Sequence, residues 1–263
     1  MKNLSLFILL LMVFQAVQAQ EYFLPVSTAS DAAKQYYYDA VISSQHADLK
    51  AYNESIQKAV KEDPNFFMAY AHFALGMAGL GQNDGFEQMA GKALAIPESQ
   101  LNPAEKSIRK ALEILKKDTK GDLSLVLNDL VTAYPDVPQV YDLGVVVNYW
   151  IHNDYQAAVE NGKKLVKLDP KCSGCYNLLG YAHMENGDLK SAKSAFKKYI
   201  KMAPNEANAF DSMGEYYIVR RKIKKPKKVE FWDLVEQSIA FQSELEKGMP
   251  VFQYQDLGRL KLT

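Results

Sequence analysis

The sequence has little cysteine, glycine or proline: its 263 residues include two, 14 and 10 of them, respectively. Two cysteines cannot hold a chain of this size together through disulfides, so packing must stabilise it. Glycine and proline are too scarce for a fibrous or low-complexity protein. Charge of one sign is not in excess either, because Lys plus Arg and Asp plus Glu each total 31. This balance argues against a dedicated nucleic-acid binder.

Long apolar runs are also missing after the amino terminus, so the sequence predicts no transmembrane span. The segment 1–19 combines a basic Lys2, an apolar run over residues 4–14 and a small Ala19. This arrangement is typical of a secretory signal peptide cleaved after Ala19. A membrane anchor is the alternative, but it needs roughly 20 apolar residues, and the run is shorter. We therefore expect an exported protein, periplasmic or secreted, whose mature chain starts with a lead-in over residues 20–32.

What the sequence does contain is punctuation that recurs about every 34 residues. Five prolines follow one another at nearly even intervals: Pro64, Pro97, Pro135, Pro170 and Pro204. Five aspartates keep a similar interval: Asp48, Asp84, Asp122, Asp154 and Asp188. Asp favours a helix start, where it accepts from free N–H groups, and Pro favours a helix end. Each period therefore predicts two helices joined by a tight turn, and stacked hairpins would share one core.

Residues 173–206 resemble the tetratricopeptide repeat. The matching positions are Tyr176, Leu179, Gly180, His183, Ala192, Phe196 and Pro204. Residues 33–66, 67–100, 104–137 and 139–172 follow the pattern more loosely, the last with its first helix shifted by one residue, and residues 207–217 begin a sixth repeat. The resemblance implies an all-α, right-handed α-solenoid of stacked helix–turn–helix hairpins over residues 33–219, containing five repeats and the first helix of a sixth.

The end of the chain departs from the repeat. Seven of the nine residues in 220–228 are Lys or Arg, and Pro226 interrupts the run. Such a segment opposes a helix, so we expect the sixth repeat's first helix to end near Val219 and residues 220–229 to form a basic linker. Apolar residues then recur at helical spacing, which predicts a final helix within residues 230–263 that caps the stack.

The resemblance to tetratricopeptide repeats also implies a concave groove, lined by the first helix of each hairpin, that holds a peptide or partner helix. Carried onto this sequence, the groove positions are Tyr37, Val41, Ala71, Leu75, Trp150, Asn177, Tyr181, Asp211 and Glu215. Carboxylates at its carboxy-terminal end would suit a polar or basic peptide. The preferred interpretation is thus a non-catalytic scaffold that binds a protein or peptide partner and needs no cofactor or metal.

Two alternatives stay open. Cys172 and Cys175 form a C-x-x-C pair, which would give either a local disulfide or a thiol–disulfide active protein. A catalytic pair usually sits on a thioredoxin-like frame, and the repeat pattern does not provide one. The basic run 220–228 would instead tether the protein to an anionic surface, with a solvated linker as the simpler interpretation.

Overall fold

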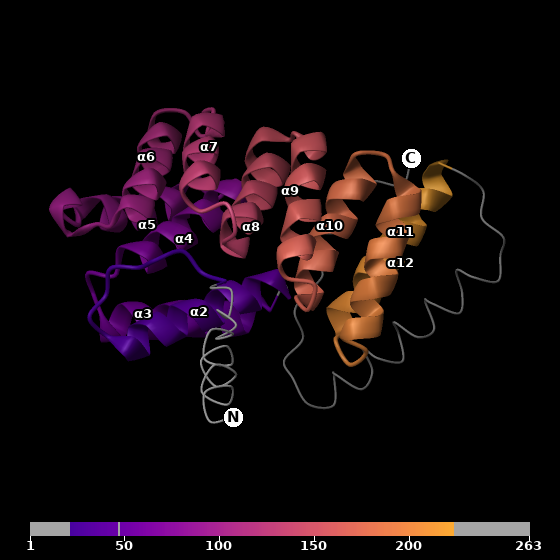
Figure 1. The fold of residues 1–263 in the computed structure, drawn as a ribbon, viewed down its shortest axis with the longest axis horizontal. Coiled ribbons are helices and arrows are strands. Elements are labelled where there is room, and N and C mark those ends of the chain that lie inside the picture. The colour runs from indigo at the N-terminus through magenta and orange to yellow at the C-terminus, as the bar shows by residue number, and fades with distance from the viewer. Residues whose placement is uncertain (1–21, 47, 224–263) are drawn as a thin grey trace, which may run out of the picture.

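The computed structural model of the protein describes residues 22–46 and 48–223. In this part of the chain the regular structure is helical and contains no strand (Figure 1). The helices are α2 (Asp31–Gln45), α3 (Leu49–Glu62), α4 (Phe67–Gly79), α5 (Asn83–Ala95), η1 (Glu98–Gln100), α6 (Pro103–Lys117), α7 (Ser124–Ala133), α8 (Pro138–Val146), η2 (Val147–His152), α9 (Tyr155–Leu168), α10 (Ser173–Glu185), α11 (Leu189–Met202) and α12 (Ala207–Ile223).

Consecutive helices pair into hairpins, namely α2–α3, α4–α5, α6–α7, α8–α9 and α10–α11, and α12 packs on α11. This arrangement confirms the predicted all-α solenoid of stacked hairpins. No helix within the two described ranges has the length and apolar character that crossing a membrane requires.

The five periodic prolines end helices as predicted. Each stands directly after the residue that closes a helix, as Pro64 follows Asp63 and Pro204 follows Ala203. Proline has no N–H to continue the helical ladder, and it drives the preceding residue toward an extended conformation. Local backbone chemistry therefore sets the period of the repeat.

The periodic aspartates begin only three of the five helices. The carboxylates of Asp48, Asp154 and Asp188 cap α3, α9 and α11 by accepting from the N–H three residues ahead, at 2.9–3.0 Å. Asp84 instead lies within the first turn of α5. Asp122 precedes the cap residue of α7 and accepts from the Ser124 N–H at 2.8 Å. Both still place negative charge near the positive end of a helix dipole.

The one-residue shift expected in repeat 139–172 has a structural counterpart. The first helix of this repeat changes from α-helix to π-helix at Val147–His152. A π-turn takes up one more residue than an α-turn. Asn153 follows in the left-handed conformation, with φ of 56°, and its backbone ends the π-turn. The insertion keeps α9 paired with α8 despite the changed register.

Hairpin α10–α11 closes tightly around Gly180. A Cβ atom at this position would stand 2.4 Å from the Phe196 ring. Phe196 is buried together with Ala192, Met213, Tyr216 and Tyr217. The small residue of the repeat pattern therefore lets the helices of this hairpin approach.

The lead-in is an extended segment up to Ser30, and it packs against distant helices. The N–H of Leu24 donates to Gln139 Oε1 at 2.7 Å, and the N–H of Ser27 donates to Glu105 Oε1 at 2.7 Å. Hairpin α2–α3 then runs crosswise to the upright helices α6–α10 (Figure 1). The first repeat thus folds back on the later ones.

At the other end, α12 continues through Arg220 to Ile223, beyond the boundary expected near Val219. The first part of the predicted basic linker is therefore helical, because the charges begin on a helix already started by residues 207–219. The predicted signal peptide, the rest of the linker and the predicted capping helix lie outside the described residues.

Candidate functional site

The predicted groove residues of the first two repeats are core residues. Tyr37, Val41 and Ala71 are completely buried, and Leu75 is nearly so. Tyr37 packs edge-on against Phe66 and His72, with ring centroids 5.4 and 5.9 Å apart. These four side chains offer no surface to a partner in this structure, which corrects the expectation that they line an open groove.

The cause is a joint between α2 and the later repeats. Gln139 Nε2 donates to the Tyr37 hydroxyl at 2.7 Å, and Gln45 Nε2 donates to Asp142 Oδ2 at 3.1 Å. Gln45 Nε2 also donates to the hydroxyl of Tyr22. Burial raises the pKa of Asp142 to about 6, and the hydrogen bond from Gln45 only partly opposes this. The joint is thus a buried polar network between residues far apart in the sequence.

The same joint extends to α10 and to the loop before α12. A Cβ on Gly174 would meet the backbone oxygen of Gln45 at 2.6 Å, so α2 and α10 touch through a glycine. His46 Nδ1 lies 2.8 Å from Glu206 Oε2, and the Tyr199 hydroxyl donates to the same oxygen at 2.8 Å. We call the side of the array that carries the predicted groove residues the inner face. Its covered half is the region where α2 lies against α8 and α10.

Beyond the covered half, predicted residues from α10 and α12 meet. The Tyr181 hydroxyl donates to Glu215 Oε2 at 2.8 Å and lies 3.3 Å from Ser212 Oγ. Tyr181, Asp211 and Glu215 are each partly exposed. Their spacing of one repeat therefore brings adjacent first helices into direct side-chain contact.

Aromatic residues from the π-helix complete this region. Tyr149 lies edge-on to Trp150 and to Tyr155, with ring centroids 4.7 and 5.5 Å apart. Tyr149 also packs on the buried Ala158, Val159 and Ala182, whereas Trp150 is 46% exposed. Trp150 therefore presents a large apolar surface next to the Tyr149 ring.

Electrostatics connects the aromatic and acidic groups. Burial raises the pKa of Glu215, and the negative charges of Asp211 and Glu185 raise it further against the Tyr181 hydrogen bond. Burial likewise raises the pKa of Tyr149, with added contributions from Glu185 and Glu215. We name this region the acidic aromatic face. Its members are Tyr149, Trp150, Tyr181, Glu185, Asp211 and Glu215.

Asn177 differs from the expectation that it sits at the groove surface. Its side chain is only 5% exposed, on a helix that packs against α2, α8, α9 and α11. Among the described side chains, Asn177 Oδ1 is a buried polar atom without a hydrogen-bond partner. It lies one helical turn before Tyr181, on the same side of α10. A buried acceptor without a hydrogen bond destabilises the folded protein, so a ligand group that donates a hydrogen bond to this oxygen would be favoured.

Cys172 and Cys175 are joined by a disulfide at the start of α10. The Cys172 sulfur also accepts from the Cys175 N–H at 3.1 Å, in the place where Ser or Asp usually caps a helix. Cys175 is completely buried, and its sulfur lies 3.8 Å from the Tyr22 hydroxyl. The pair therefore fixes the end of α10 that faces the joint. Within residues 22–46 and 48–223, no group of three or more His, Cys, Asp or Glu is arranged to hold a metal ion.

Comparison with known families matches residues 173–206 to the tetratricopeptide repeat. This match confirms the resemblance seen in the sequence for residues 173–206, which form a tetratricopeptide repeat. No curated protein matches significantly.

Solved structures with a related arrangement of helices share little sequence. MamA MSR-1 is 16% identical with a TM-score of 0.48, covering 68% of this chain and 98% of that chain. PilW, a type IV pilus biogenesis factor, is 17% identical with a TM-score of 0.45, covering 88% and 100%. MamA of Desulfovibrio magneticus RS-1 is 20% identical with a TM-score of 0.37, covering 68% and 99%. These values say nothing about partners or activity.

Proposed function

We propose that the protein is a non-catalytic scaffold whose acidic aromatic face binds a cationic segment of a protein partner. The observation that carries the proposal is the contact of Tyr181 with Glu215, near Asp211 and Tyr149. The exposed ring of Trp150 lies edge-on to Tyr149. Carboxylates pair with Lys or Arg, and aromatic faces attract the same cations. A segment carrying both charge and apolar side chains therefore fits this region better than a purely apolar one.

The raised pKa of Glu215 supports the same ligand chemistry. Its carboxylate is partly buried next to other negative charges, which disfavours its ionised form. A bound ammonium or guanidinium group would reverse this effect by supplying the missing positive charge. The cluster is thus arranged to gain more from a cation than isolated surface carboxylates would.

The test uses a fluorescent oligolysine peptide as the probe and fluorescence anisotropy as the measurement. The double substitution Asp211→Asn, Glu215→Gln removes both charges and keeps the side-chain shapes. It is expected to weaken oligolysine binding about tenfold, equivalent to about 1.4 kcal/mol. Glu54→Gln, Glu62→Gln on the exposed surface of α3 is the matched control. Equal losses in the two variants, or equal binding of an oligoglutamate peptide, would reject the acidic aromatic face as the site.

We also propose that the chain is exported, with cleavage after Ala19. Residues 1–19 support this through their basic start and short apolar run. The Cys172–Cys175 disulfide is in keeping with an oxidising compartment, where such bonds persist.

The thiol–disulfide alternative receives less support, because a catalytic pair usually sits on a thioredoxin-like frame, and residues 22–46 and 48–223 contain helices but no strand. Cys172 is partly exposed, whereas Cys175 is buried. The tether alternative depends on residues 220–228, of which only Arg220–Ile223 are described.

A further inference from the structure

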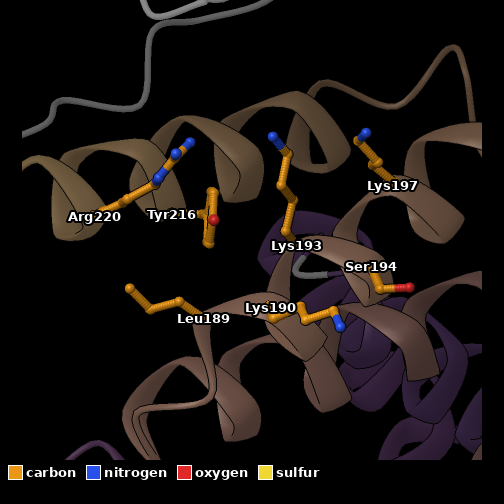
Figure 2. Close-up of a pocket in the computed structure, with 7 residues that line it drawn as sticks. All are labelled: Leu189, Lys190, Lys193, Ser194, Lys197, Tyr216 and Arg220. Carbon is orange, nitrogen blue, oxygen red and sulfur yellow. The ribbon is translucent and has the colours of Figure 1, made fainter. Parts of the chain in front are cut away.

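A positively charged groove lies between α11 and α12, and none of its lining residues belongs to the acidic aromatic face. Figure 2 shows Arg220 and Tyr216 on the α12 side and the lysines on the α11 side. The cavity measures about 500 Å³. Four cations line it: Lys190, Lys193, Lys197 and Arg220. Leu189 and Tyr216 add apolar groups to its lining. The groove therefore suits an acidic segment with apolar side chains.

The position of the groove in the array explains why it is open. Each earlier hairpin pairs its first helix with a second helix, whereas α12 packs on α11 and α10 within the described chain. Ile218 of α12 is accordingly 43% exposed. Stacked repeats need their last apolar face covered, or it meets water.

The chain that follows α12 has the chemistry the groove requires. Residues 230–246 contain five acidic residues and no Lys, Arg or His: Glu230, Asp233, Glu236, Glu244 and Glu246. Their apolar residues recur at helical spacing: Phe231, Leu234, Val235, Ile239, Phe241 and Leu245. Groove and segment are therefore opposite in charge and alike in carrying apolar side chains.

We propose that the groove between α11 and α12 is a docking site for residues 230–246 of the same chain. The stretch from Ile223 to Glu230 reaches at most about 25 Å, and Arg220 at the end of α12 already lines the groove, so the tether is long enough. A short tether also gives the segment an effective concentration on the order of millimolar. A free acidic partner at lower concentration would have to displace it.

The experiment measures proximity in the full-length protein with a short bismaleimide crosslinker. Ser194→Cys in the groove is paired with Ser238→Cys in the segment. The native cysteines do not compete, because they are joined to each other. Asn53→Cys on the exposed surface of α3, paired with the same Ser238→Cys, is the control. We expect the groove pair to give about tenfold more intrachain product, measured by mass spectrometry of the peptides.

Charge reversal then tests the stated cause. Lys190→Glu, Lys197→Glu should lower the intrachain yield several-fold, as should about 1 M NaCl, where the screening length falls to about 3 Å. Lys50→Glu, Lys61→Glu on α3 is the matched control and should leave the yield unchanged. Changing Glu230, Asp233 and Glu236 to Lys in the Lys190→Glu, Lys197→Glu variant should restore the intrachain yield. Recovery would show that the first change had removed the charge attraction and had not unfolded the protein.

Three results would overturn the proposal. Equal yields from the groove pair and the α3 pair would show that the segment does not prefer the groove. A product linking two chains in place of the intrachain product would assign the groove to a second copy. Failure of the charge-swapped variant to recover, with an unchanged circular dichroism spectrum, would exclude charge complementarity. Each result leaves oligolysine binding at the acidic aromatic face untouched, so the two proposals fail separately.

Discussion

The two halves of the inner face follow the same repeat pattern, yet the side chains of one are buried and those of the other are partly exposed to solvent. In the covered half, the groove positions Tyr37 and Val41 are fully buried, and the buried Asp142 accepts a hydrogen bond from Gln45. In the open half, which is the acidic aromatic face, Tyr181 donates a hydrogen bond to Glu215, and both side chains are partly exposed to solvent. The repeat pattern therefore determines which side chains point inward, and the fold-back of α2 determines whether they are available.

The largest effect is expected from crowding the packing beneath the open half. Gly180→Leu places side-chain atoms where the Phe196 ring lies, 2.4 Å from the new Cβ. Overpacking of this kind should lower the free energy of unfolding by about 3 kcal/mol. Thermal unfolding followed by circular dichroism measures it. Gly91→Leu on α5 is the control, because nothing lies within 4 Å of its Cβ, and it should be neutral or slightly stabilising. An unchanged melting temperature for Gly180→Leu would contradict the described packing.

A pH-dependent effect is expected from the covered half. The folded pKa of Asp142, about 6, exceeds its usual 3.8, so the folded state holds the proton more tightly. Stability from this group is complete below about pH 4 and is lost as the pH rises through 6. Asp142→Asn removes the loss and should raise the free energy of unfolding at pH 7, relative to wild type, by on the order of 2 kcal/mol.

Urea unfolding of wild type and Asp142→Asn at several pH values measures this difference. The advantage of the variant should shrink toward pH 4, where the wild-type carboxyl is protonated as well. Asp129→Asn, at an exposed position on α7, is the control. A difference that does not change between pH 4 and 7 would mean that Asp142 is not buried beneath α2.

The smallest effect tests the joint alone. Gly174→Ala puts a methyl group 2.6 Å from the Gln45 carbonyl oxygen, so α2 must move away from α10. We expect a loss of about 1 kcal/mol and faster hydrogen exchange in α2, with exchange in α11 unchanged. Gly214→Ala, which has open space around its Cβ, is the control. Faster exchange in α11 as well would show that the two halves respond as one unit.

Much of the fold was predictable because its determinants are local. Pro64 and Pro204 end helices through missing N–H groups, and Asp154 and Asp188 begin helices through their carboxylates. The shift in repeat 139–172 was visible in the sequence, although its form as a π-helix was not.

The site was only partly predictable. Tyr181, Asp211 and Glu215 meet because neighbouring repeats place equivalent positions side by side. The buried Tyr37 accepts a hydrogen bond from Gln139, 102 residues away, and no local pattern specifies that contact. Glu185 was missed because its role comes only from its closeness to Glu215 and Tyr149.

The contact between His46 and Glu206 has a mechanical consequence. It joins positions 160 residues apart, so the described helices form a closed loop. An open array stretches like a spring, and its repeats can come apart one at a time from an end. An array closed by the His46–Glu206 contact resists extension until that contact breaks. The pulling force then acts on each of the hairpins between α3 and α11. When the chain is pulled at both ends, this contact and the neighbouring joint must therefore break before the hairpins between α3 and α11 can separate.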